Sequence, residues 1–126
     1  MDKLTILNHS EWIIMERLWQ QPYTLMELSA VLAESIGWSK STVATLLRRM
    51  EDKGIVSYTE RGRTKVFTPA ISRDAVTARE TESLLKRAYN GSIGLLVSAM
   101  AQRNDLTKED IAELYEILRK AEEDAK

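Results

Sequence analysis

Residues 39–69, SKSTVATLLRRMEDKGIVSYTERGRTKVFTP, decide the fold of this chain. Ser39 or Ser41 is suited to cap the start of a helix here, and Gly54 stands just past its expected end. The apolar residues follow the i, i+3, i+4, i+7 spacing of one helix face, at Val43, Leu46, Leu47 and Met50. The opposite face is polar and carries Lys40, Thr42, Thr45, Arg48, Arg49 and Asp52. The stretch therefore opens with a helix that has one apolar and one polar face.

A β-hairpin is predicted directly after this helix. Residues 55–59 and 64–68 are rich in β-branched and aromatic side chains, which favour strands. The segment between them, Glu60–Arg63, contains Gly62 with an arginine on either side and is expected to form the turn. Pro69 closes the hairpin.

Two more helices are expected before residue 39. The first runs from Ser10, as its N-cap, to about Trp19, and the second begins at Thr24, which has the capping-box spacing to Glu27. Gly37 supplies the turn before the third helix. Three helices followed by a hairpin is the order of a winged helix-turn-helix, whose third helix is presented to the major groove of DNA. We therefore expect a mainly α fold with a small β-hairpin wing.

Charge is segregated along the chain, although the net charge is only −1. Residues 1–39 contain two basic and five acidic side chains, whereas residues 40–65 contain seven basic and three acidic ones. A local basic block in a near-neutral protein is expected where one face meets phosphates. The simpler interpretation, that these charges only solvate a helix and a hairpin, stays open at this point.

The composition argues against several other classes of protein. With no cysteine and a single histidine, His9, the chain offers no thiol nucleophile, no disulfide and almost nothing for metal or acid–base chemistry. No nucleophile–base pair and no glycine-rich phosphate loop stand out. No apolar run approaches the roughly 20 residues of a membrane span. We therefore expect a cytoplasmic protein that is not an enzyme, binds no metal or cofactor and does not enter the membrane.

Three further helices are predicted after Ser72, separated by Asn90–Gly91 and by residues 104–105, with a capping box at the start of the last one, from Thr107 to Asp110. Three short helices cannot easily bury their own apolar stripes, so a symmetric dimer is favoured over packing against the N-terminal domain. The expected domains are a winged helix, 1–71, and a helical dimerisation domain, 72–126. The candidate dimerisation residues are Leu84, Leu96, Met100, Ile111, Leu114, Tyr115 and Leu118.

Three motifs in this order resemble the penicillinase-repressor family of bacterial transcription regulators (BlaI/MecI/CopY type). They are SEWIIMERLW at 10–19, STVATLLRRM with DKG at 41–54, and the wing from 61 to 69. The resemblance covers the chain from about Leu4 to Leu118 and is strongest over the first 70 residues. It implies a homodimer with an N-terminal winged helix and a C-terminal helical dimerisation region. Such a dimer binds a short inverted-repeat operator and represses transcription, here of a resistance or stress-response operon.

The resemblance also places the DNA contacts. Hydroxyl groups among them can read base edges or grip phosphates, whereas the basic side chains mainly supply charge. Gly62 lets the backbone of the wing approach the sugar-phosphate wall. The implied contacts from the third helix are Lys40, Ser41, Thr42, Thr45, Arg48 and Arg49, and those from the wing are Arg61, Gly62, Arg63 and Lys65.

Release of the operator is less well defined by the resemblance. In the best-known members a sensor-activated protease cuts an Asn-Phe bond in the C-terminal region. The corresponding dipeptide here is Ala99–Met100, which departs from that bond. The cysteine cluster of the copper-responsive branch is absent. A sensor-activated protease is therefore a candidate partner, with Ala99 and Met100 as the candidate cleavage region.

Two other functions stay open at the level of sequence. A winged helix can instead dock an acidic protein partner without sequence-specific DNA binding. A small molecule held between the domains would make the chain a ligand-sensing regulator, although no polar constellation in the sequence supports such a site. Trp12, Trp19 and Trp38 could line an aromatic pocket, but their helical spacing and their position beside a turn favour a place in the core.

Overall fold

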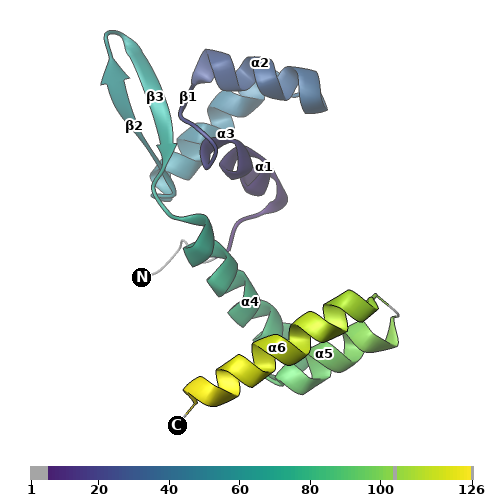
Figure 1. Ribbon diagram of the computed structural model, residues 1–126. Helices are drawn as coiled ribbons and strands as arrows, with labels where there is room; N and C mark the ends of the chain where they lie inside the picture. Colours follow the sequence, from purple (N-terminus) through teal and green to yellow (C-terminus); the bar gives the residue numbers. More distant parts are fainter. Residues whose placement is uncertain (1–5, 104, 126) are drawn as a thin grey trace. The chain divides into compact units, whose positions relative to one another are not determined.

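Six helices and three short strands make up the structure, a computed structural model that describes residues 6–103 and 105–125. The elements are shown in Figure 1 and comprise α1 (His9–Leu18), β1 (Tyr23–Thr24), α2 (Leu25–Ile36), α3 (Lys40–Asp52), β2 (Val56–Arg61), β3 (Thr64–Pro69), α4 (Arg73–Tyr89), α5 (Ile93–Gln102) and α6 (Lys108–Asp124). The chain divides into two compact units, one ending at Thr81 and the other beginning at Glu82. Within the described residues, no helix is both long enough and apolar enough to span a membrane.

The first helix begins two residues earlier than expected. Its N-cap is Asn8, whose side chain accepts a hydrogen bond from the backbone N–H of Glu11 at 2.9 Å. The Glu11 carboxylate in turn accepts from the backbone N–H of Asn8 at 3.0 Å, which completes a capping box. The prediction of Ser10 as the cap was wrong because the residue three positions after it, Ile13, cannot return such a bond.

The second and third helices begin and end as the sequence predicts. Thr24 and Glu27 form the expected capping box at the start of α2. Gly37 ends α2 with a φ of 76°, a left-handed conformation that glycine adopts without strain. Ser39, rather than Ser41, caps α3 by accepting a hydrogen bond from the backbone N–H of Thr42.

The three strands form one antiparallel sheet in the order β1-β3-β2. The hairpin is longer than predicted, because Glu60 and Arg61 lie in β2 opposite Lys65 and Thr64. The turn is therefore Gly62–Arg63 alone, and Gly62 has the positive φ, 65°, that a two-residue hairpin turn requires. The two-residue strand β1, absent from the prediction, pairs with the middle of β3.

A single apolar core holds the N-terminal unit together. It is built from α1, α2, α3 and the sheet, and its fully enclosed residues include Ile14, Leu28, Val43 and Met50. Val76 of α4 is also fully buried in this core. The three tryptophans, Trp12, Trp19 and Trp38, are half-buried and pack against it. They therefore flank the core rather than form its buried interior, and the rings of Trp12 and Trp19 meet edge to face with their centres 5.7 Å apart.

The first half of α4 is attached to α1 by polar contacts. The indole N–H of Trp19 donates to the carbonyl of Ile71 at 2.9 Å, and that of Trp12 donates to the Glu80 carboxylate at 3.4 Å. The guanidinium of Arg73 donates to Glu16 and lies 4.8 Å over the ring of Trp19. The expected domain boundary at residues 71/72 therefore precedes a segment that packs with the N-terminal unit, and the domain limits stay a prediction.

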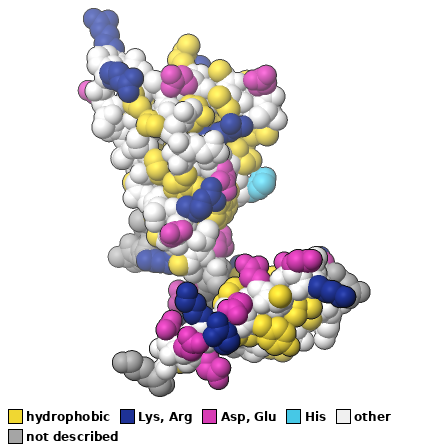
Figure 2. Space-filling view, in the orientation of Figure 1, with side chains coloured by type: hydrophobic (Ala, Val, Ile, Leu, Met, Phe, Trp, Pro, Cys, Tyr) yellow, Lys and Arg dark blue, Asp and Glu magenta, His cyan; other side chains and the backbone are white. Residues whose placement is uncertain are grey.

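The C-terminal unit consists of the second half of α4 with α5 and α6. Asn90 and Gly91, both with positive φ, end α4, and a capping box of Thr107 and Asp110 begins α6, both as predicted. Neither α5 nor α6, which the structure describes throughout, contains a buried residue. Figure 2 shows the resulting yellow hydrophobic area on this unit. The apolar stripes predicted from the sequence are thus at the surface of the single chain.

Candidate nucleic-acid interface

Helix α3 presents the six predicted contact residues to solvent. Val43, Leu47 and Met50 are buried and fix the rotation of the helix about its axis. The opposite face is consequently exposed. That face carries Lys40, Ser41, Thr42, Thr45, Arg48 and Arg49. The geometry is that of a helix whose polar side is available to enter a groove.

The hydroxyl groups at the start of α3 contact one another. The Ser39 hydroxyl lies 3.0 Å from that of Thr42, to which it donates, and 3.1 Å from that of Ser41. The Lys40 ammonium lies 3.5 Å from the sulfur of Met26 on α2. Within the part of the chain that the structure describes, the Thr45 hydroxyl has no hydrogen-bond partner, which leaves it available to a bound molecule.

The β2–β3 hairpin carries the four predicted wing residues, all of them exposed, near or at its turn: Arg61, Gly62, Arg63 and Lys65. Figure 2 shows dark blue basic side chains gathered at the far end of this hairpin. The Lys65 ammonium lies 4.2 Å from the centre of the Tyr58 ring, a cation–π contact within the hairpin, whereas Arg61 and Arg63 flank Gly62 at the turn itself. The wing therefore offers positive charge at its tip.

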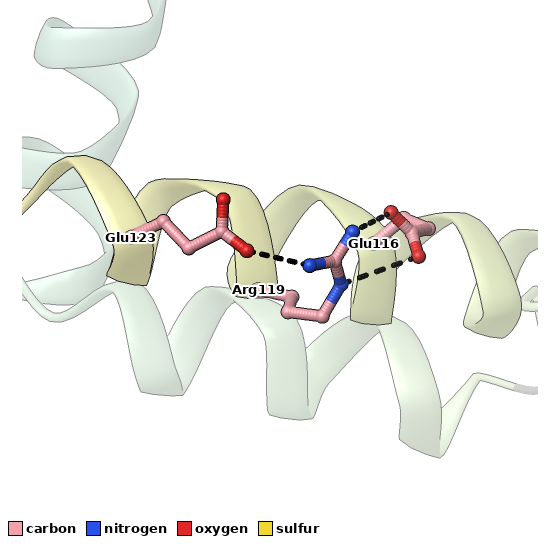
Figure 3. A network of polar contacts seen from close by, with 3 residues as sticks. All are labelled: Glu116, Arg119 and Glu123. Atoms are coloured by element: carbon pink, nitrogen blue, oxygen red, sulfur yellow. Dashed lines mark hydrogen bonds and ion pairs between the residues drawn. The ribbon is translucent and has the colours of Figure 1, made fainter.

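Four arginines of this surface have no acidic partner among residues 6–103 and 105–125: Arg48, Arg49, Arg61 and Arg63. Arg119 on α6 provides a contrast, because its guanidinium pairs with Glu116 at 2.9 Å and with Glu123 at 2.6 Å (Figure 3). The charge of Arg119 is neutralised within its own helix. The four arginines of α3 and the wing are not neutralised in this way by any residue that the structure describes, so their charges are available to an anion.

Helix α3 separates two surface hollows. On one flank, Arg48 lines a groove together with Arg63 and Lys65 of the wing. On the other flank, Thr45 and Arg49 line a hollow together with Trp38 and residues at the start of α1 and α3. The arginines at 48 and 49 are adjacent in the sequence and yet serve different sides of the helix.

One basic residue of the block 40–65 is used within the fold. The ammonium of Lys53, at the end of α3, donates to the Glu11 carboxylate at 2.5 Å. Glu11 is only 2% exposed, so this is a largely buried charge held by an ion pair and by the cap of α1. Sequence reasoning missed Glu11, although its spacing from Asn8 is that of a capping box. Segment charge counts therefore overstate the positive charge of the exposed face.

The structure offers no arrangement for metal binding among the residues it describes. No group of three or more His, Cys, Asp or Glu side chains lies close enough together to hold an ion there. His9, the single histidine, lies exposed at the first position of α1.

Comparison with known proteins agrees with this geometry. Residues 7–120 match the family of the penicillinase repressor. The chain belongs to the penicillinase repressor family. The family resemblance predicted from the helix and wing motifs is confirmed. This family is one of transcriptional repressors, and the winged helix of the N-terminal unit is its DNA-binding fold.

Individual members of the penicillinase repressor family align with almost the whole chain. The penicillinase repressor of Bacillus licheniformis is 30% identical over 119 residues, which are 94% of this chain and 93% of the relative. The methicillin resistance regulatory protein MecI of Staphylococcus aureus (strain N315) is 23% identical over 122 residues, which are 95% and 99% of the two chains. The solution structure of the DNA binding domain of the repressor BlaI matches 60% of this chain and 93% of that domain, with a TM-score of 0.53 and 28% identity.

Proposed function

We propose that this chain is a dimeric repressor that binds an inverted-repeat operator through α3 and the wing and controls a resistance or stress-response operon. The observation that carries the proposal is the groove shared by Arg48 of α3 and by Arg63 and Lys65 of the wing. Cations from two separate elements converge there, and acidic partners for the arginines are lacking in the described part of the chain. A surface of this kind, in a member of a repressor family, suits the phosphates of double-stranded DNA.

The two flanks of α3 suggest which residues contact bases and which contact phosphates. In the major groove, Thr42, Thr45 and Arg49 are the residues that we expect to reach base edges, since a hydroxyl or a guanidinium can hydrogen-bond there. Arg48, Arg61 and Arg63 are expected to contact phosphates on either side of that groove. The backbone at Gly62 presents no side chain to the sugar-phosphate wall.

Dimerisation is supported by the exposed apolar surface of the C-terminal unit. Tyr115 and Leu118 on α6 are 72% and 63% exposed, and Met100 on α5 is 48% exposed. Large apolar side chains left in solvent by a single chain favour burial against a second copy. Two winged helices joined in this way would meet two half-sites of an inverted repeat.

Release by proteolysis is a further part of the proposal. Ala99 and Met100, the candidate cleavage dipeptide, lie inside α5. A cut there would separate α6, with its exposed apolar residues, from the rest of the chain and so weaken the dimer. Because proteases act on extended segments, α5 has to unwind locally before the sensor-activated protease can cut it.

The phosphate role of Arg63 is tested by the salt dependence of DNA binding. We expect Arg63→Ala to weaken binding to all sequences and to reduce the slope of log affinity against log salt by about 0.9, one phosphate contact. Arg119→Ala is the matched control, because Arg119 is also an exposed arginine but is neutralised within α6. An unchanged slope for Arg63→Ala, measured by fluorescence anisotropy, would remove Arg63 from the interface.

The base-reading role of Thr45 is tested by sequence preference. Thr45→Val keeps the shape of the side chain and removes its hydroxyl, so we expect it to alter the ranking of operator variants while leaving the salt slope unchanged. If the ranking is unaltered, Thr45 does not read bases. If the unmodified chain shows no preference among sequences at all, the winged helix is better explained as a module that docks an acidic protein.

A further inference from the structure

The groove between the start of α2, α3 and the wing combines two kinds of lining. Its volume is about 380 Å³, which lies within the range of small-molecule sites. Leu47 and Phe67 form an apolar floor that is almost fully buried, and Met26 of α2 adds a flexible, exposed thioether. The basic side chains of α3 and the wing also line this groove. The groove is thus an apolar surface with a charged border.

The border carries a surplus of positive charge. Arg48, Arg63 and Lys65 are opposed by a single acidic residue in the groove, Glu51. Neither arginine forms an ion pair with any residue that the structure describes, Glu51 included. The ammonium of Lys40, bonded to the sulfur of Met26, adds a further cation at the same end of α2. The groove is therefore electrostatically complementary to an anion.

DNA alone does not account for the apolar part of the lining. A phosphodiester satisfies Arg48 and Arg63 but gains little from the exposed Met26 thioether or from the part-exposed side chains of Leu25 and Ala44, which also line the groove. An aromatic body would cover these side chains favourably, and sulfur–aromatic contacts add to this. A carboxylate on such a body would pair with the planar guanidinium groups at the border. We propose that this groove binds a small organic anion consisting of a carboxylate on an aromatic body.

A bound anion would also regulate DNA binding. This part of the proposal rests on the proposed function, namely DNA binding by α3 and the wing. The anion and the DNA backbone would use the same cations, Arg48 and Arg63. A bound anion would therefore compete with the operator and release the repressor without cutting the chain. This site lies within the N-terminal unit, in contrast to the position between the domains that sequence reasoning considered for a small molecule.

The first test uses 2-naphthoate with the full chain, in the absence of DNA. Titration followed by amide chemical shifts should perturb Ala44 and Thr64, which line the groove on α3 and on the wing. The neutral analogue 2-naphthylmethanol should bind about tenfold more weakly, because it lacks the charge-assisted hydrogen bonds. Shifts confined to α5 and α6, or equal affinity for the two compounds, would overturn the proposed site.

Adjacent arginines provide the matched variants. Arg48→Ala should lower the affinity for 2-naphthoate about tenfold, since Arg48 lines the groove. Arg49→Ala removes the same charge one residue away, on the flank of α3 that lines the other hollow, and should leave the affinity unchanged. An equal loss in both variants would show only general attraction to a basic surface and would contradict the site.

Competition is then measured by anisotropy of a bound duplex. We expect 2-naphthoate to raise the apparent Kd for DNA in the unmodified chain, and 2-naphthylmethanol to do so far less. Naphthoate bound in the groove without displacement of DNA would overturn the regulatory part of the proposal. A chain that binds naphthoate there but no DNA would overturn the proposed function and leave the anion site intact.

Discussion

The carboxylate of Glu11 joins two parts of the fold that are far apart in sequence. It accepts hydrogen bonds from the backbone of Asn8 and from the ammonium of Lys53. Lys53 is the C-cap of α3, so the ion pair holds the end of α3 against the start of α1. A buried carboxylate is tolerated only when it is paired in this way.

Loss of the Lys53 ammonium should therefore destabilise the N-terminal unit. We expect Lys53→Met to lower the free energy of unfolding by about 1–3 kcal/mol, because Glu11 is left buried with one partner fewer. Glu11→Gln with Lys53→Met should recover part of this loss, since the double variant has no buried charge. Urea denaturation of the two variants and of the unmodified chain measures both effects, and an unchanged midpoint for Lys53→Met would show that the ion pair with Glu11 does not stabilise the fold.

Ser29, unlike Glu11, has a buried polar group without a partner among the described residues. The hydroxyl of Ser29, in the interior of α2, is buried and has no hydrogen-bond partner within the described structure. Ser29→Ala removes that unsatisfied group and adds a better helix former, so it should raise the free energy of unfolding by about 1 kcal/mol. Thermal unfolding checks this, and a lower Tm would show that the hydroxyl has a partner after all.

The sequence is enough to place the predicted contact residues of α3 on an exposed face, but not to assign them to the two flanks of the helix. The spacing of Val43, Leu47 and Met50 was enough to place the polar residues of α3 on its exposed face. The grouping of Arg48 with Arg63 depends instead on where the hairpin lies beside α3, which is a tertiary relation. For the same reason Lys53 looked like one more basic residue of the exposed block.

Among the secondary-structure elements, most helix starts could be predicted from local capping signals, whereas the short strand β1 could not be predicted. The boxes at Thr24 and Thr107 predict the starts of α2 and α6 because the deciding contacts are local in sequence, whereas the equally local box of Asn8 and Glu11 at α1 was missed in favour of Ser10. The strand β1 has two residues, too few for any periodicity, and exists because Tyr23 and Thr24 meet Phe67 and Val66 across the sheet. Partners of that kind cannot be seen in a local pattern.

The ion pair between Glu16 of α1 and Arg73 of α4 should make the stability of the fold depend on pH in the acidic range. Hydrogen bonds from Arg73 lower the pKa of Glu16, with the nearby positive charge acting in the same direction and desolvation opposing them. A carboxyl group whose pKa is lower in the folded state stabilises the fold above its unfolded pKa and loses this effect as the pH falls through the folded pKa. Glu16 in turn raises the pKa of Arg73, which stays charged throughout this range.

Arg73→Gln tests the contribution of this ion pair. The variant should be less stable than the unmodified chain at neutral pH, and the difference should shrink at about pH 3, where glutamates are largely protonated. Lys86→Gln is a control, because it breaks an exposed pair with Glu82 within α4 that contributes little at either pH. A difference for Arg73→Gln that stays constant between the two pH values would contradict the role of Glu16.

For the whole molecule, the exposed apolar residues of α5 and α6 predict association. Leu118→Lys places a charge at a position that the single chain leaves largely in solvent, so the fold of the chain should survive while the dimer is lost. Operator affinity should fall together with dimerisation, because each winged helix then binds its half-site alone. Ile6→Lys is the control at an exposed apolar residue outside these helices. Analytical ultracentrifugation measures the oligomeric state of both variants. A Leu118→Lys variant that is still dimeric would show that the interface does not include Leu118.

We propose that this winged helix, as a dimer, recognises an inverted repeat. The most direct test of this proposal is selection of a random double-stranded library by the purified full chain at about 150 mM salt, a physiological ionic strength. The best sequence is then titrated by fluorescence anisotropy. We predict recovery of an inverted repeat bound by two chains. Weak binding with no sequence preference would contradict the proposal.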